Sequence, residues 1–187
     1  MRVAIFGGSF NPPHVAHQMA ALYVLETAPV DELWLVPVVR HAFGKSLAPF
    51  EDRLEMCRLA AAALGPRVRV SAIERDLGGD SRTLRTIRRL QQEHPGHAFS
   101  LVIGADLVRE VASWYGGEEL QRTVPFLVVG RGGVGATAGT SVVLPAVSSS
   151  QIRSALAAGQ DAGALLPRAV RDYISAHNLY KAPEESA

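Results

Sequence analysis

The segment Gly7–His17, which reads Gly-Gly-Ser-Phe-Asn-Pro-Pro-His-Val-Ala-His, concentrates residue types that can bind and polarise a phosphate. It follows an apolar run, Val3–Phe6, that predicts a buried strand, and it precedes apolar residues at helical spacing. A glycine-rich turn between a strand and a helix presents backbone N–H groups to an anion. His14 and His17 would share one face of the first helical turn, where imidazole can donate a hydrogen bond to a phosphate oxygen. The pattern predicts a nucleotide-phosphate site that carries two catalytic histidines.

Other interpretations of this segment fit its residues less well. The Gly7–Gly8 pair alone could form a tight turn with positive φ and bind nothing, but Ser9, Asn11 and the two histidines follow it directly. A zinc site needs three or four ligands, and no Cys/His cluster in the sequence complements the histidine pair. The segment also lacks the Gly-Lys-Ser/Thr of the P-loop and the third glycine of the dinucleotide fingerprint.

A second segment, Ser148–Arg153, reads Ser-Ser-Ser-Gln-Ile-Arg and predicts the start of a helix. Its first serine and its glutamine have the spacing of a capping box. A capped helix N-terminus still presents N–H groups to an anion, so Ser149 and Ser150 are candidate phosphate ligands. Arg153 would extend toward the same phosphates.

Short apolar or β-branched runs alternate with helical patterns along the chain. The strand candidates are Val3–Phe6, Glu32–Val36, Val68–Ala72, Phe99–Ile103, Phe126–Val129 and Ser141–Leu144. The helix candidates are His17–Thr27, Phe50–Leu64, Thr83–His94, Ala105–Glu110 with a continuation to Trp114, Ser149–Ala158 and Pro167–His177. This alternation predicts an α/β fold with a Rossmann-like, doubly wound parallel sheet. Ligands of such sheets bind beyond the carboxyl ends of the strands, where Gly104, Asp106 and Arg131 are further candidates.

Composition limits the class of protein. The 187 residues predict one domain over residues 1–181, with a flexible tail at 182–187. A net charge of +1 favours neither nucleic acid nor a membrane surface, and no apolar run approaches the roughly 20 residues that span a bilayer. The single cysteine, Cys57, cannot form an intramolecular disulfide and is predicted to be a packed, inert thiol. With no signal peptide visible, these features predict a cytoplasmic protein.

The two segments together resemble the two signatures of the nucleotidylyltransferase family. The first is similar to Gly-Gly-Ser/Thr-Phe-Asp/Asn-Pro-x-His-x-Gly-His, with Ala16 where glycine is usual. The second is similar to Ser-Ser/Thr-x-x-Arg, with Ser150 where threonine is frequent. The similarity extends from Val3 to Tyr180 and is strongest to the nicotinate-nucleotide adenylyltransferase branch. Its further matches are Glu51–Met56, Glu74 with Ser81–Thr86, Gly104–Asp106 with Trp114 and Tyr115, and the C-terminal Leu166–Tyr180.

The resemblance implies a sheet of the nucleotidylyltransferase type and transfer of an adenylyl group from ATP to nicotinate mononucleotide. His14 and His17 would hold the α-phosphate oxygens, and Lys45 and Arg153 would neutralise the departing pyrophosphate. Mg²⁺ would bind through the ATP phosphates and keep most of its waters, without a dedicated protein site. The implied ATP-binding residues are Gly7, Gly8, Ser9, Phe10, His14, His17, Lys45, Gly104, Asp106, Arg131, Ser149, Ser150 and Arg153.

The same resemblance implies an acceptor site made by Thr83, Leu84, Trp114 and Tyr115. Trp114 would stack on the pyridine ring, with an ordinary packed aromatic as the alternative. Backbone groups of Thr83, Leu84 and Tyr115 would lie near the nicotinate carboxylate. Asp106 would accept a hydrogen bond from a ribose hydroxyl or, alternatively, cap the helix that follows it.

Three departures from the family pattern concern the acceptor. Arg82 replaces a tyrosine, Arg85 replaces an aspartate, and His41–Lys45 replaces a Pro-Pro-His-Lys stretch. The arginine run through Arg88 and Arg89 is interpreted mostly as a solvated helix face, with Arg82 as the candidate partner for a carboxylate or phosphate. Nicotinamide mononucleotide and phosphopantetheine are alternative acceptors for the same reaction. A protein that binds nucleotides as a regulator, without catalysis, is the alternative function. The sequence leaves open whether the chain is a monomer or a homodimer.

Overall fold

The computed structural model of the chain describes residues 1–40, 44, 46–131 and 143–181. Its strands are β1 (Arg2–Gly8), β2 (Glu32–Pro37), β3 (Val68–Val70), β4 (Ala98–Gly104), β5 (Phe126–Arg131) and β6 (Val143–Leu144). Its α-helices are α1 (Val15–Thr27), α2 (Phe50–Ala62), α3 (Ile73–Leu77), α4 (Thr83–Glu93), α5 (Gly117–Thr123), α6 (Ser149–Ala157) and α7 (Arg168–Ala176). Two 3₁₀ helices are η1 (Val108–Ser113) and η2 (Gly163–Leu165). The predicted tail, 182–187, lies outside the described residues.

The strands form a parallel sheet in the order β3-β2-β1-β4-β5-β6. This is the strand order of a doubly wound Rossmann-like sheet, so the predicted fold class is confirmed. The order of the strands along the chain reverses between β1 and β4, which are hydrogen-bonded neighbours. Sheets of this kind bind ligands at that reversal, beyond the carboxyl ends of the two strands.

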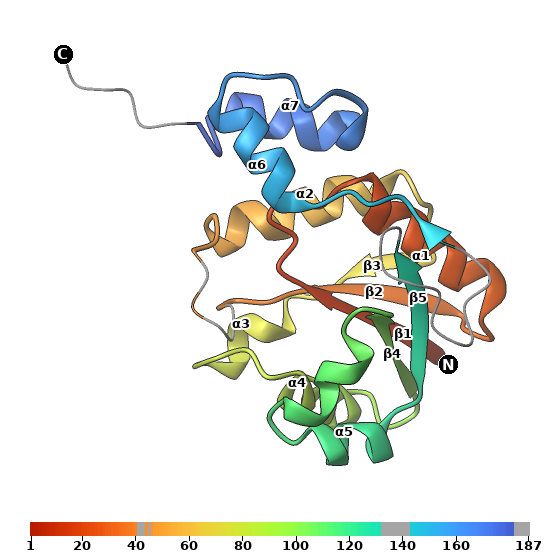
Figure 1. Cartoon of the computed structure of the whole chain (residues 1–187). Coiled ribbons are helices and arrows are strands. Elements are labelled where there is room, and N and C mark those ends of the chain that lie inside the picture. The colour runs from red at the N-terminus through yellow and green to blue at the C-terminus, as the bar shows by residue number, and fades with distance from the viewer. Residues whose placement is uncertain (41–43, 45, 132–142, 182–187) are drawn as a thin grey trace.

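Side chains of each strand alternate between the two faces of the sheet, and both faces are apolar. Ala4 and Leu33 belong to the layer that packs under α1 and α2. Val3 and Trp34 belong to the opposite layer, which packs against α4 and α5. Figure 1 shows these two pairs of helices on opposite sides of the sheet. Cys57 is fully buried in the first layer, as predicted, and burial raises the pKa of its thiol.

A third apolar cluster joins the C-terminal helices to the rest of the molecule. Met56 of α2 packs with Ile152 of α6 and with Val170 and Ile174 of α7. The Tyr173 hydroxyl donates to Asp52 Oδ1 of α2 at 2.8 Å. Figure 1 shows α6 and α7 stacked beyond α2, on the side away from the sheet. This packing places the N-terminus of α6 beside the segment that follows β1.

The region after β4 differs from the sequence prediction. The helix predicted over Ala105–Trp114 is a 3₁₀ helix over Val108–Ser113. The Ala105 N–H still donates to the Val129 carbonyl of the neighbouring strand, which delays the start of the helix. The helices α3 and α5 have only five and seven residues, too few for a clear apolar period, and the sequence pattern does not anticipate them.

Several other boundaries are displaced by one or two residues, and two of these displacements have a local cause. The helix α1 begins at Val15 rather than His17, because His14 is already its N-cap. The strand β3 ends at Val70 rather than Ala72. The Ser71 hydroxyl accepts a hydrogen bond from the N–H that opens α3, and the chain leaves the sheet there.

Candidate active site

The carboxyl end of β1 carries the two glycines that the sequence singled out. Gly7 and Gly8 are the last residues of the strand and pair with Val36 and Pro37 of β2. Neither has a positive φ, so the alternative of a positive-φ glycine turn is wrong. A Cβ added to Gly7 would meet no protein atom within 4 Å, because the space in front of it is a cavity. The glycine therefore keeps the backbone open to a ligand.

The strained residue of this region is Phe10, in the phosphate loop that we define as Ser9–His14. Its φ is 45°, a left-handed value that residues with a side chain rarely adopt. The ring is buried and packs against Phe6, with centroids 5.7 Å apart, and against His17, with centroids 4.9 Å apart. Backbone strain of this kind persists only where surrounding packing enforces it, as it does in functional loops.

The two histidines lie together at the start of α1. Their rings stack with centroids 3.8 Å apart. The backbone N–H of His14 donates to His17 Nδ1 at 3.1 Å, so Nδ1 is an acceptor and the ring proton of neutral His17 resides on Nε2. His14 is 2% exposed, whereas His17 is half-buried. The hydrogen bond and the stacking fix one tautomer of His17 and the plane of its ring. Both are fixed at the N-terminus of α1, where an anion is favoured.

The N-terminus of α6 docks on the phosphate loop, although the two segments are far apart in sequence. Ser149 Oγ donates to the Pro12 carbonyl at 2.9 Å. Arg153 Nη1 donates to the Asn11 carbonyl at 2.8 Å, and its Nη2 donates to Ser150 Oγ at 3.3 Å. The predicted capping box is confirmed in the same turn. The structure thus brings both signature segments to one place.

Arg53 holds the loops together and was missed as a functional residue by sequence reasoning. Its side chain is only 1% exposed and donates to four carbonyls: Ser9 at 2.9 Å, Val38 at 2.7 Å, Val39 at 3.2 Å and Ala48 at 2.9 Å. Burial lowers the pKa of this guanidinium, which has no carboxylate partner among the described residues. The sequence could have indicated this role. Arg53 falls on the apolar face of a predicted amphipathic helix, and a buried guanidinium needs hydrogen-bond acceptors.

Asn11 is the second anchor of the phosphate loop. Its side chain is buried, and Oδ1 accepts hydrogen bonds from the Ala48 N–H at 3.1 Å and from the Tyr180 hydroxyl at 2.9 Å. Burial raises the pKa of Tyr180, so this hydroxyl stays a donor over the physiological range. The C-terminal segment, α6 and the approach to α2 therefore all hold the same loop.

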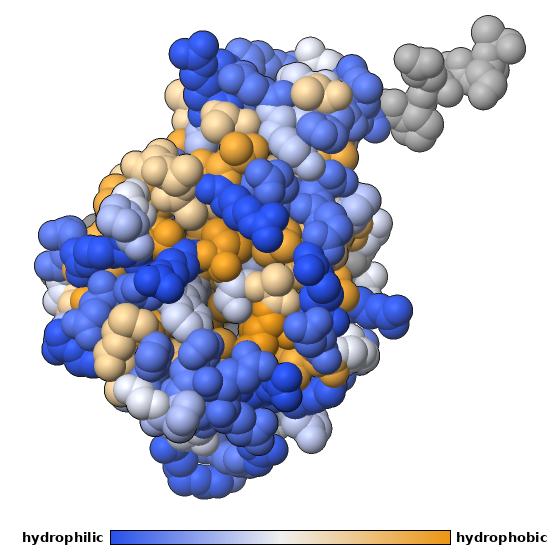
Figure 2. Space-filling model, turned by 180° about the vertical axis from the view of Figure 1, so that it is seen from behind, coloured by the Kyte–Doolittle hydropathy of each residue, from blue (hydrophilic) through white to orange (hydrophobic). Residues whose placement is uncertain are grey.

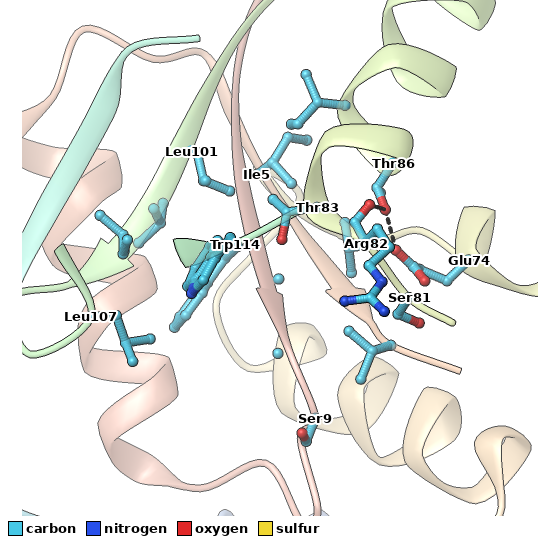
Figure 3. A pocket seen from close by; sticks show the side chains of 18 of the residues that line it. Ile5, Ser9, Glu74, Ser81, Arg82, Thr83, Thr86, Leu101, Leu107 and Trp114 are labelled. Carbon is cyan, nitrogen blue, oxygen red and sulfur yellow. Dashed lines mark hydrogen bonds between the residues drawn. The ribbon is translucent and has the colours of Figure 1, made fainter. Parts of the chain in front are cut away.

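A cavity of about 570 Å³ lies beyond the ends of β1, β2 and β4. Figure 3 shows Trp114, Leu101 and Leu107 on one side of it and Arg82, Ser81 and Glu74 on the other. In Figure 2, apolar side chains gather in the hollowed middle of the face, between the part that carries α6 and α7 and the part that carries α4 and α5.

The polar side of the cavity is ordered by hydrogen bonds. The buried Glu74 accepts a hydrogen bond from the Thr86 hydroxyl, which Figure 3 marks with a dashed line. Ser81 Oγ accepts a hydrogen bond from the Val39 N–H at 3.1 Å and so connects the segment before α4 to the loop after β2. These contacts tie the start of α4 to the strand ends.

The predicted residues divide into those that line this cavity and those that surround the phosphate loop. The cavity is lined by Gly7, Gly8, Ser9, Gly104, Thr83, Trp114 and Tyr115. The other group lies on or against the phosphate loop and consists of Phe10, His14, His17, Ser149, Ser150 and Arg153. The Leu84 side chain instead packs in the core, so only its backbone can serve a ligand.

Three predicted residues need separate mention. Asp106 is not the N-cap of η1, which is Leu107, so the capping alternative is wrong. A Cβ on Gly104 would collide with the Asp106 carboxylate, so the glycine makes room for it. Arg131 lies at the end of β5, where its backbone pairs with Leu144. Lys45 lies outside the described residues.

Comparison with known proteins assigns the chain to a family. The family model described as cytidylyltransferase-like matches residues 5–155. A probable nicotinate-nucleotide adenylyltransferase from Anaeromyxobacter dehalogenans is 50% identical over 96% of each chain. Another from Myxococcus xanthus is 39% identical over 96% of this chain and 95% of its own. This chain belongs to the nicotinate-nucleotide adenylyltransferase family.

Solved structures show the same fold in this family. The Plasmodium falciparum nicotinic acid mononucleotide adenylyltransferase complexed with NaAD has a TM-score of 0.80 at 23% identity, covering 96% of this chain and 97% of that one. The same enzyme complexed with APC has a TM-score of 0.81 at 22% identity, with 96% of each chain covered. These adenylyltransferases therefore share the whole architecture described above.

Two further findings concern metals and membranes. In the part of the chain that the structure describes, no three His, Cys, Asp or Glu side chains form a cluster that could hold a metal ion. Among the same residues, no helix combines the length and apolar character needed to cross a bilayer.

Proposed function

We propose that the chain transfers the adenylyl group of ATP to nicotinate mononucleotide, giving nicotinate adenine dinucleotide and pyrophosphate in NAD biosynthesis. One observation carries this proposal: the histidine-bearing phosphate loop and the N-terminus of α6 meet beside a cavity with an aromatic wall. Curated relatives of up to 50% identity, named for this activity, support it.

The phosphate loop would act on the reacting phosphorus. The 5′-phosphate of the mononucleotide attacks the α-phosphorus of ATP in line, and because this nucleophile is already an anion, no strong general base is needed. Catalysis is then a matter of positioning and charge stabilisation. The Nε2–H of His17 donates to an α-phosphate oxygen, and His14 orients it through the stacked rings and the hydrogen bond to Nδ1.

The leaving pyrophosphate would be stabilised by cations. Arg153 is already fixed against the Asn11 carbonyl, so its guanidinium is ordered before the ligand arrives. Lys45 is proposed for the same role from the sequence. Mg²⁺ bound through the ATP phosphates would supply further neutralisation and keep most of its waters.

The cavity would receive the mononucleotide, and we refer to it from here as the acceptor cavity. Trp114 is half-buried on its wall, which suits stacking on a pyridine ring. The first turn of α4 presents the backbone N–H groups of Thr83 and Leu84, and Tyr115 also lines the cavity. N–H donors of this kind favour a carboxylate over a carboxamide.

The test is pyrophosphate release from ATP and Mg²⁺ with nicotinate mononucleotide, nicotinamide mononucleotide and phosphopantetheine assayed side by side. We expect the highest kcat/KM with nicotinate mononucleotide and formation of nicotinate adenine dinucleotide by mass spectrometry. Turnover of phosphopantetheine alone would overturn the assignment of nicotinate mononucleotide as the acceptor. Binding of ATP without turnover of any acceptor would favour a non-catalytic nucleotide-binding regulator instead.

We also propose a cytoplasmic location. The single cysteine is buried and free, as a reducing compartment allows. Fractionation of the native host, with the chain followed by an antibody, tests this directly. Recovery in a membrane or extracellular fraction would contradict it.

A further inference from the structure

The acceptor cavity has an uneven distribution of charge. Among the described residues that line it, the acidic and basic side chains are Glu74, Glu110 and Arg82. Glu74 is buried and already accepts the hydrogen bond from Thr86. A ligand that carries a carboxylate into this cavity therefore meets two acidic side chains and a single guanidinium. Burying an unpaired anion is costly, so binding of such a ligand depends on the guanidinium of Arg82.

Arg82 is held so that it can serve a ligand. Its guanidinium lies 5.9 Å from the centroid of the Tyr115 ring, within the range of a cation–π contact. Its Nη2 contacts Asp80 Oδ2 at 3.3 Å, with the two side chains 36% and 56% exposed. Exposed pairs of this kind contribute little, and a guanidinium has five N–H donors, so most of its donor capacity remains. Figure 3 shows Arg82 across the cavity from Trp114.

The other arginines of the same run are bound elsewhere. Arg85 donates to the Leu77 carbonyl at 2.9 Å and to the Gly78 carbonyl at 3.3 Å. Arg88 pairs with Glu119, and Arg89 pairs with Glu93 at 2.7 Å on the helix surface. None of these three lines the cavity. The interpretation of most of the run as a solvated face therefore suits these three arginines, and Arg82, the predicted exception, is the one that lines the cavity.

We propose that Arg82 determines acceptor specificity by binding the carboxylate of the nicotinate ring through its guanidinium. The inference rests on the proposed function and names the group that separates the acid mononucleotide from the amide. A guanidinium and a carboxylate form two parallel, charge-assisted hydrogen bonds, whereas a carboxamide offers a single neutral acceptor. The cation–π contact with Tyr115 orients the guanidinium, and Trp114 would hold the pyridine ring on the opposite side of the cavity.

The size of the effect follows from hydrogen bonds to charged groups. Loss of such an interaction corresponds to a fall of roughly 10- to 100-fold in kcat/KM for the acid mononucleotide. The fall should come mainly from KM, because the carboxylate is bound equally in the ground state and the transition state. The amide mononucleotide carries no charge on its ring substituent, so its kcat/KM should change by less than about threefold.

The experiment compares Arg82→Met with Arg85→Met as the matched control, using the full chain, ATP and Mg²⁺. We measure kcat/KM for nicotinate mononucleotide and for nicotinamide mononucleotide with each protein. The ratio of the two constants does not depend on the fraction of folded enzyme, so partial unfolding cannot imitate the result. We expect the acid-to-amide ratio to fall 10- to 100-fold in Arg82→Met and to stay unchanged in Arg85→Met. Arg82→Lys keeps the positive charge but loses the two parallel N–H donors, so its acid-to-amide ratio should lie between the ratios of the two Met variants.

Three results would overturn the inference. An equal loss with both mononucleotides would place Arg82 on the shared 5′-phosphate. An unchanged ratio would show that the backbone donors of α4 suffice. A ratio that falls equally in Arg85→Met would show that the effect is a general one of positive charge. An unmodified chain that turns over neither mononucleotide would instead overturn the proposed function, and the inference with it.

Discussion

The phosphate loop and the acceptor cavity are held by different kinds of contact. The phosphate loop is fixed by partly buried hydrogen bonds from Arg53, Tyr180 and Arg153, which come from three separate parts of the chain. The acceptor side is ordered around Arg82 by contacts of half-exposed side chains. The chemistry thus resides where the structure is most constrained, and the choice of acceptor resides where a side chain can change without unfolding the protein.

This difference has a physical basis. Charge stabilisation in a transition state needs donors placed before the reaction, and buried networks supply that order. Discrimination between two acceptors needs only one group that treats them differently, and such a group tolerates partial exposure. Substitutions in the two regions should therefore separate into losses of kcat or stability and losses of specificity.

The largest expected effect is that of His17→Ala. Removing one donor to a transition-state oxygen typically costs about 100- to 1,000-fold in kcat. We expect that loss with both mononucleotides, and a melting temperature close to that of the unmodified chain. The exposed His177 provides the control, since His177→Ala should leave kcat unchanged. A loss below tenfold in His17→Ala would remove His17 from the reacting centre.

Arg53→Met tests whether the phosphate loop depends on its buried network. The substitution leaves four carbonyls without their donor. Each buried acceptor left unpaired costs about 1–3 kcal/mol, so we expect a loss of roughly 3 kcal/mol or more in the free energy of unfolding. Urea denaturation measures it. Arg58→Met on the same helix removes only an exposed pair with Glu55 and should cost less than about 1 kcal/mol. Equal losses in the two variants would contradict the network.

Gly7→Ala tests whether this glycine is needed for ligand binding rather than for the stability of the fold. The added Cβ meets no protein atom, so the free energy of unfolding should stay constant or rise slightly. The methyl group enters the cavity, and an overpacking cost of about 1–3 kcal/mol corresponds to a rise of roughly 5- to 150-fold in the KM for a nucleotide substrate. Gly65→Ala is the opposite case, because the φ of Gly65 is +84° and the residue is remote from the cavity. It should lower stability by about 1 kcal/mol without changing KM.

The smallest effect is expected for Tyr180→Phe. The substitution removes one hydrogen bond to Asn11 Oδ1, which keeps its second bond from the Ala48 N–H. We expect a loss of about 1 kcal/mol in stability and a fall in kcat of a few-fold, with the acid-to-amide ratio unchanged. A shift in that ratio would mean that the two regions are coupled. Steady-state kinetics with both mononucleotides decides the matter.

The sequence by itself determined the fold class and the position of both signature segments. Apolar periodicity in Val3–Phe6 and in α1 reflects local burial, and the capping box around Ser148 and Gln151 is a contact between residues three apart. Such features depend on neighbours along the chain, so a single sequence reveals them. The acceptor site of Thr83, Leu84, Trp114 and Tyr115 followed from the family resemblance, and Thr83, Trp114 and Tyr115 do line one cavity.

Only the tertiary structure decided which side chains face a common site. The sequence offered Arg82 only as a candidate, and the structure shows that Arg82 lines the cavity whereas Arg85 bonds the end of α3. Arg53 and Tyr180 reach the phosphate loop across long stretches of sequence, and the helix after β4 is shortened by a hydrogen bond to β5. These outcomes depend on the strand order and on long-range packing, because a contact between distant residues has no periodic signature in the chain.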